Sequence, residues 1–201
     1  MKNIIACSLL TFLMCLCIGC GNKEASETID SYITAECTWA YDVTNPKVVI
    51  ENNDYFVKVR VKSKDKTKYF VKNTIMPNST YNVDVLEVVS STNSKLPKNI
   101  NIAVNGGVVT MKEYVNTLDS VTRQKTNTEK LSEKDLQKRV LISNESYYDL
   151  KPGNEYYISI RDLTQDNDYK GYYGMPEGGY DVFIEKDGAF VNVLTQQKLS
   201  K

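Results

Sequence analysis

The chain has 201 residues, with 25 basic side chains, 25 acidic side chains and no histidine. This length suits one domain whose core needs no disulfide staples. A formal net charge of zero argues against a nucleic-acid-binding protein, because such proteins need a surplus of lysine and arginine to neutralise phosphates. Without histidine the chain cannot build a Ser-His or Cys-His catalytic triad, and no motif calls for a cofactor.

The first twenty residues have the pattern of an export signal. Lys2 precedes a largely apolar run at residues 4–18, which is short for a bilayer span of about 20 residues and typical of a signal peptide. The run ends in Cys17-Ile18-Gly19-Cys20. This sequence resembles the lipobox of bacterial lipoproteins, in which the signal is cut before the last cysteine and that cysteine carries lipid. In the lipobox a leucine usually stands where this chain has Cys17.

The resemblance predicts a signal peptide at residues 1–19, lipid attachment at Cys20 and a polar tether at residues 20–34. A secretory signal without lipid and an uncleaved short anchor are the alternatives. Stable anchoring takes two lipid chains or more, and bacterial lipoproteins carry at least two. We therefore expect the protein to be anchored by its lipid at the extracytoplasmic face of the cell membrane.

Cys37 is the one cysteine outside the predicted signal and its lipidated end. It lies in a strand-like run at residues 36–41, so we expect it to be a small buried side chain. A reactive thiol is the alternative. The chain has no CxxC or Cys-His spacing, which excludes a structural zinc site.

Apolar and polar residues then alternate with a period of two, which predicts a mainly β domain at residues 35–201. Four runs alternate in this way, at residues 55–62, 81–88, 100–104 and 156–160. The second run changes parity near Leu86, which indicates a β-bulge or a bent strand. A last pair of runs, within residues 180–191, flanks Asp187-Gly188, and this arrangement predicts a hairpin.

Between the third and fourth runs the apolar spacing becomes helical. The first helical stretch contains Met111, Tyr114, Val115 and Leu118. A second stretch, residues 132–142, opens with the cap-like pair Ser132 and Asp135. We therefore expect a helical insertion at about residues 110–142. Its mixed charges at residues 129–139 are typical of a solvated face, and a docking surface for another protein is the alternative.

Five strands with a helix after the third resemble the oligonucleotide/oligosaccharide-binding (OB) barrel. The succession of motifs narrows the resemblance to a family of small, largely uncharacterised exported lipoproteins of Gram-positive bacteria, with an OB-like barrel related to the netrin-like fold. The motifs are VDVLEV at residues 83–88, INIAVNGG at 100–107, LKPGNEYY at 150–157 and a glycine- and tyrosine-rich stretch before residue 187. The resemblance covers roughly residues 55–190. It implies a five-stranded OB-like barrel with a helical insertion between strands three and four, and no enzymatic activity.

The loop at residues 162–179 holds two groups of candidate site residues. Asp166, Asp168 and Glu177 follow the spacing of an EF-hand calcium loop. Lys170 occupies a position where a calcium ligand belongs, and the flanking sequence predicts strands rather than helices. A solvated surface loop is therefore favoured over a metal site.

Tyr169, Tyr172 and Tyr173 form the second group. In an OB-like barrel this loop joins strands four and five and belongs to the usual ligand face. Tyrosine combines apolar area with a polar tip, so these rings are candidates to stack on a sugar or to hold a peptide. The alternative is that they cap the end of the barrel core.

These observations favour a non-catalytic binding module with a protein, peptide or glycan ligand, a membrane partner through its lipid, and no nucleic-acid partner. A carboxylate-dependent hydrolase of cell-wall glycan is one alternative, since paired acids need no histidine. A calcium-binding surface protein is the other.

Overall fold

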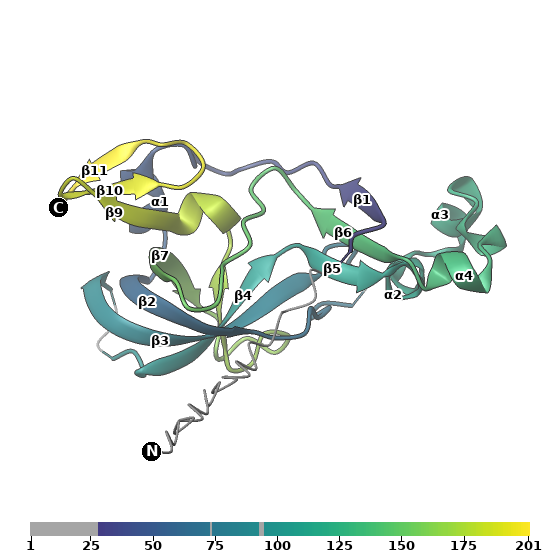
Figure 1. Ribbon diagram of the computed structural model, residues 1–201, viewed down its shortest axis with the longest axis horizontal. Coiled ribbons are helices and arrows are strands. Elements are labelled where there is room, and N and C mark those ends of the chain that lie inside the picture. Colours follow the sequence, from purple (N-terminus) through teal and green to yellow (C-terminus); the bar gives the residue numbers. More distant parts are fainter. Residues whose placement is uncertain (1–27, 73, 93–94) are drawn as a thin grey trace, which may run out of the picture.

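The computed structural model describes residues 28–72, 74–92 and 95–201. Within these residues the strands form an eight-stranded sheet and a three-stranded sheet. The larger sheet curls into a barrel, and the smaller one forms an arm that leads away from the barrel to three short helices (Figure 1). None of the helices in this part of the chain has the length and apolar character needed to cross a membrane.

Five strands close the barrel in the order β7-β2-β3-β4-β8, and β8 pairs back with β7. Their bounds are β2 Tyr55–Lys64, β3 Asn78–Ser91, β4 Asn99–Asn105, β7 Glu155–Asp162 and β8 Tyr172–Met175. The β4–β8 pair is parallel and the other barrel pairs are antiparallel. Counted along the chain, this is the cyclic order 1-2-3-5-4 of an OB barrel. The predicted mainly β, five-stranded OB-like barrel is confirmed.

The fifth barrel strand is not where the sequence pattern placed it. It is β8, which lies inside the predicted loop at 162–179, and the 180–191 hairpin stands outside the barrel. That hairpin consists of β9 Val182–Lys186 and β10 Ala189–Asn192, with β11 Lys198–Ser200 at its far edge. Strand β9 pairs with β7 through Tyr157 and Ile158, so the hairpin extends the sheet past the barrel.

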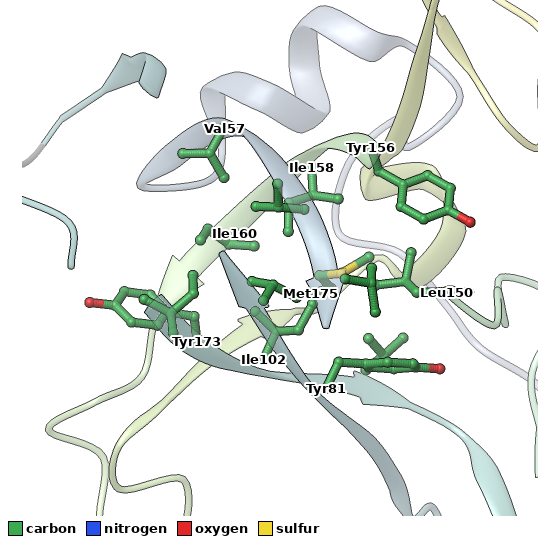
Figure 2. Close-up of a cluster of buried hydrophobic side chains, with 14 of the residues drawn as sticks. Val57, Tyr81, Ile102, Leu150, Tyr156, Ile158, Ile160, Tyr173 and Met175 are labelled. Atoms are coloured by element: carbon green, nitrogen blue, oxygen red, sulfur yellow. The ribbon is translucent and has the colours of Figure 1, made fainter. Parts of the chain in front are cut away.

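Alternation along the strands fills the barrel with apolar side chains, as Figure 2 shows. The largest of the fully buried residues in this core are Tyr81, Ile102, Leu150, Ile158, Ile160 and Met175. A second cluster packs the hairpin against the outside of the barrel and consists of Phe56, Tyr157, Phe183 and Phe190. Strand β7 is therefore buried on both faces, which fixes the position of the hairpin.

Two local predictions are confirmed in detail. The β2–β3 register skips Leu86, between the pairs Lys58–Glu87 and Val59–Val85, and this bulge turns the side chain of Leu86 out to solvent. In the hairpin, both Asp187 and Gly188 have positive φ (53° and 76°), as a two-residue turn between antiparallel strands requires.

The arm contains the insertion. Its sheet has the order β1-β6-β5, with β1 Ser31–Thr34, β5 Gly107–Thr110 and β6 Arg139–Ser143. Between β5 and β6 come α2 Met111–Thr117, α3 Ser120–Lys125, the 3-10 turn η1 Thr128–Lys130 and α4 Glu133–Leu136. Thr110 and Glu113 form a capping box that starts α2.

Three boundaries differ from those predicted. The stretch 132–142 is helical only over α4, because Val140 and Ile142 are the buried side chains of strand β6. The predicted tether ends earlier than residue 34, since residues 31–34 form β1 and pair with β6 in parallel. Residues 36–41 form no strand and instead cross to α1 Pro46–Glu51, which packs against the 3-10 turn η2 Gly178–Asp181.

Candidate functional site

Two barrel connections meet at one end and bring aromatic rings together. Phe70, from the β2–β3 connection, stacks on Tyr169, from the β7–β8 connection, with ring centroids 4.8 Å apart. Tyr172, at the start of β8, meets Phe70 edge-on at the same separation. Lys68 Nζ donates a 2.7 Å hydrogen bond to the Tyr172 hydroxyl and lies 5.1 Å from the centre of that ring. We call these four residues the loop cluster.

The loop cluster is ordered and still reaches solvent. Its three rings are half-buried and Lys68 is exposed. Burial raises the pKa of the Tyr169 hydroxyl, so this group keeps its proton. Rings that hold one another in place lose little further freedom when a ligand binds, which favours recognition.

The three predicted tyrosines are divided by the alternation of strand β8. Tyr172 faces outward in the loop cluster, whereas Tyr173 faces inward and packs its ring against Tyr55 at 6.0 Å. Tyr173 is only 6% exposed. For this tyrosine the alternative to ligand binding, packing in the barrel core, therefore applies. A ligand contact stays a prediction for Tyr169 and Tyr172. No local pattern indicated Phe70 and Lys68, because their connection follows a charged turn at residues 63–68 and shows no alternation that marks a ligand face.

A row of side-chain amides lies beside the loop cluster on the outer face of β3 and β4. Asn82 Nδ2 donates to Asn99 Oδ1 (3.0 Å) and to Asn101 Oδ1 (3.1 Å). Asn101 in turn is the register partner of Tyr172 across the β4–β8 pair. Amide groups and an aromatic ring therefore share one continuous surface.

A pocket of about 130 Å³ opens next to this surface. Its floor is a row of register partners across three strands, Ala103 on β4, Gly174 on β8 and Arg161 on β7. Ala103 and Gly174 are small residues, and the Leu163 side chain lies over Gly174 and lines the pocket with them. Tyr169 of the loop cluster forms part of the wall, which joins the pocket to the cluster.

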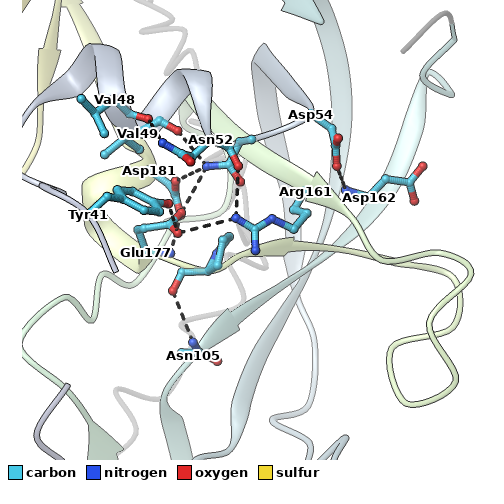
Figure 3. A network of polar contacts seen from close by, with 12 residues as sticks. Tyr41, Val48, Val49, Asn52, Asp54, Asn105, Arg161, Asp162, Glu177 and Asp181 are labelled. Carbon is cyan, nitrogen blue, oxygen red and sulfur yellow. Dashed lines mark hydrogen bonds and ion pairs between the residues drawn. The ribbon is translucent and has the colours of Figure 1, made fainter. Parts of the chain in front are cut away.

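Behind Arg161 lies a buried group of polar side chains, shown in Figure 3. Asn53 Nδ2 donates to Glu177 Oε2 and to Asp181 Oδ1, both at 3.1 Å. The Tyr41 hydroxyl donates to Glu177 Oε1, and the backbone N–H of Glu177 donates to Asp181 Oδ2 at 2.8 Å. We call Tyr41, Asn53, Glu177 and Asp181 the buried acid group.

Burial shapes the chemistry of this group. Asp181 has no exposed surface and Glu177 only 4%. Burial, together with the charge of Glu177 and a hydrogen bond to it, raises the pKa of Asp181 well above the usual carboxyl range. Burial and the hydrogen bond to Glu177 also raise the pKa of Tyr41. These acids face protein side chains rather than an open cleft, so the arrangement serves to hold elements together.

The three acids that follow the EF-hand spacing, Asp166, Asp168 and Glu177, do not come together in the structure. Asp166 lies in the exposed loop at 163–171, where its Oδ1 accepts hydrogen bonds from the backbone N–H groups of Asp168 and Tyr169. Glu177 belongs to the buried acid group instead. In the part of the chain that the structure describes, no three Cys, Asp or Glu side chains are grouped to hold a metal ion.

The two cysteine predictions have different outcomes. Cys20, the predicted lipid attachment site, lies outside the described residues. Cys37 is half-buried rather than buried, and Asn144 Nδ2 donates to its sulfur at 2.9 Å.

Neither family models, nor curated protein sequences, nor solved structures give a match to this chain. The resemblance to exported lipoproteins therefore stays a prediction.

Proposed function

We propose that the protein is a non-catalytic binding module, anchored by lipid on Cys20 at the extracytoplasmic face of the membrane, and that its ligand is a glycan. The observation that carries the proposal is the loop cluster. It joins the β2–β3 and β7–β8 connections, which are the two loops that flank the ligand face of an OB barrel. Its rings and its lysine come from segments about 100 residues apart in sequence, as the 104-residue separation of Lys68 and Tyr172 illustrates.

The surface beside the loop cluster supports a glycan over a peptide or protein. Sugars present hydroxyl groups at the edge of each ring and C–H groups on its faces. Asn82, Asn99 and Asn101 offer both donors and acceptors to hydroxyls, and Tyr172 offers an aromatic face with a polar tip. Among the described residues, two large exposed apolar side chains, Val71 and Ile75, lie in the β2–β3 connection, and the others lie away from the loop cluster, for example Leu86 and Val88 on the far end of β3.

The geometry gives the hydrolase alternative less support. Glycoside hydrolysis needs two carboxyl groups that flank a substrate, with room for the sugar between them. Glu177 and Asp181 are the acids that the fold brings together here, and both are buried and bonded to protein groups. The calcium alternative loses its basis as well, because Glu177 is separated from Asp166 and Asp168.

Binding to insoluble glycans tests the proposal. The full-length chain in detergent is sedimented with purified peptidoglycan, chitin or cellulose. We expect retention on at least one of them, and loss of that retention in Tyr172→Ala with only a small fall in melting temperature, because this ring is half-buried. Tyr32→Ala is the matched control, because Tyr32 is 70% exposed and lies on β1 in the arm. Failure to sediment with any of the three, or equal retention by Tyr172→Ala, would contradict glycan binding at this face.

The anchor has its own test. The chain is expressed in a Gram-positive host, and the membrane fraction is analysed by mass spectrometry. We expect a chain that begins at Cys20 and carries acyl groups, and we expect Cys20→Ser to leave the membrane fraction. An unacylated chain that keeps residues 1–19 would contradict the lipoprotein prediction.

A further inference from the structure

We propose that the pocket next to the loop cluster receives the acetamido group of an N-acetylated amino sugar, so that the glycan ligand is one built from such sugars. This inference rests on the proposed function and goes further, because it names the sugar class. Its basis is the shape and chemistry of the pocket at Ala103, Gly174 and Arg161.

The pocket is one step along the sheet from the predicted stacking ring. On strand β8 the outward positions are Tyr172 and then Gly174, and on β4 they are Asn101 and then Ala103. Two residues of a strand span about 6.6 Å. A sugar ring held at Tyr172 and Asn101 therefore places a neighbouring substituent at the pocket beside Ala103, next to the Leu163 side chain that covers Gly174.

One side of the pocket is apolar and suits the methyl group of an acetamido substituent. Leu163 lies over Gly174, since a Cβ on that glycine would come within 2.6 Å of Leu163 Cδ1. Ala103, Leu163 and Met175 together give the pocket an apolar lining. A volume of about 130 Å³ suits a small substituent rather than a whole sugar.

The polar side of the pocket offers hydrogen-bond donors. Arg161 Nη2 donates to the backbone carbonyl of Asn52 at 3.1 Å and lies 3.9 Å from Glu177 Oε1. Its Nε and Nη1 groups have no protein partner among the described residues, and the side chain is 41% exposed. These donors suit the carbonyl oxygen of an acetamido group. Asn78 and Asn105 also line the pocket, and Asn78 Nδ2 donates to Asn105 Oδ1 at 2.9 Å.

The charge of the pocket favours a neutral acceptor over an anion. The Glu177 carboxylate lies against the Arg161 guanidinium and offsets its charge. Burial raises the pKa of Asp181, behind Glu177, well above the usual carboxyl range and so disfavours its charged form. A carboxylate or phosphate ligand would meet a guanidinium that is already paired, whereas an amide carbonyl needs only its free N–H groups.

Two tetrasaccharides that differ only in the acetamido group provide the test. Isothermal titration of the full-length chain compares N,N′,N″,N‴-tetraacetylchitotetraose with cellotetraose, which has the same β-1,4 backbone and hydroxyls in place of the acetamido groups. We expect the acetylated ligand to bind about tenfold more tightly or better, the size of one well-made hydrogen bond in a closed site. Equal affinities would overturn the inference and leave glycan binding in place. Binding of neither would overturn both.

A pocket-filling variant locates the effect. Ala103→Leu occupies the pocket, so we expect its affinity for the acetylated ligand to fall to that for cellotetraose, with cellotetraose binding unchanged. Ala189→Leu, on the distant hairpin, is the matched control. If Ala103→Leu lowers the melting temperature, Leu163→Phe fills the same space from the loop. Full acetamido preference in a folded pocket-filling variant would overturn the assignment of this pocket.

Discussion

The Tyr41 hydroxyl donates a hydrogen bond to Glu177 Oε1 across 136 positions of sequence. This bond fastens the segment between β1 and α1 to the residues that follow β8. The acceptor is almost fully buried, so the bond is also part of what makes burial of Glu177 tolerable.

We therefore expect Tyr41→Phe to destabilise the protein by about 1–3 kcal/mol, the cost of removing a partner from a buried charged group. Urea unfolding followed by circular dichroism measures this change. Tyr32→Phe removes a hydroxyl from a side chain that is 70% exposed and should leave the unfolding free energy unchanged. An unaltered midpoint for Tyr41→Phe would mean that another donor replaces Tyr41.

Asp181 makes stability depend on pH. Its pKa in the folded protein is raised, chiefly by burial, so the folded state binds a proton that the unfolded chain releases. This contribution is fully present below the ordinary carboxyl pKa of about 4 and is lost as the pH rises toward the raised pKa of the folded state. We expect Asp181→Asn, which stays neutral at all pH values, to remove this decline.

Unfolding free energies measured from about pH 4 to pH 8 test the Asp181 prediction. The wild type and Asp181→Asn should have similar stability at the acid end, and the variant should be the more stable at the alkaline end. Asp187→Asn, in the exposed hairpin turn, is the matched control and should follow the wild type. Parallel curves for the wild type and Asp181→Asn would show that Asp181 does not titrate with folding.

The sequence predicted those parts of the fold whose signal is local. Alternation located four of the five barrel strands, the parity change near Leu86 located a bulge, and Asp187-Gly188 located a turn. Strand β8 was not predicted from the sequence, because it has only four residues, one of them Gly174. It also pairs with strands that are distant in sequence. The spacing of Leu136, at the end of α4, with Val140 and Leu141 in β6 also fits one continuous helix, and pairing with β1 and β5 decides in favour of a strand.

The candidate site was predictable only in part for the same reason. Tyr169 and Tyr172 stood out by composition, but the inward turn of Tyr173 follows from the register of β8. Phe70, Lys68 and Arg161 join the site through contacts between connections that no local pattern encodes. Asp181 carries no sequence signal, because its burial depends on α1 and η2 packing together.

Gly106 turns the chain from the barrel into the arm, between β4 and β5. Its φ is +99°, and a Cβ there would come within 2.6 Å of Tyr147 Cδ2. Gly153 also has a positive φ, +85°, but a Cβ would meet nothing within 4 Å. We expect Gly153→Ala to cost about 1–2 kcal/mol from backbone strain alone, and Gly106→Ala to cost more because the clash adds to the strain. Equal losses in urea unfolding would contradict a tight contact at Gly106.

The neighbours Tyr172 and Tyr173 separate ligand contact from core packing. Tyr173→Ala removes a ring that belongs to the barrel core (Figure 2) and packs edge-on against Tyr55, and we expect a loss of about 3–5 kcal/mol. Tyr172→Ala removes a half-buried ring and one exposed hydrogen bond, and we expect a loss of about 1 kcal/mol. Urea unfolding of both variants measures the difference. If Tyr172→Ala costs as much as Tyr173→Ala, Tyr172 is a cap of the barrel end, and a loss of glycan retention in that variant would reflect a damaged fold rather than a missing contact.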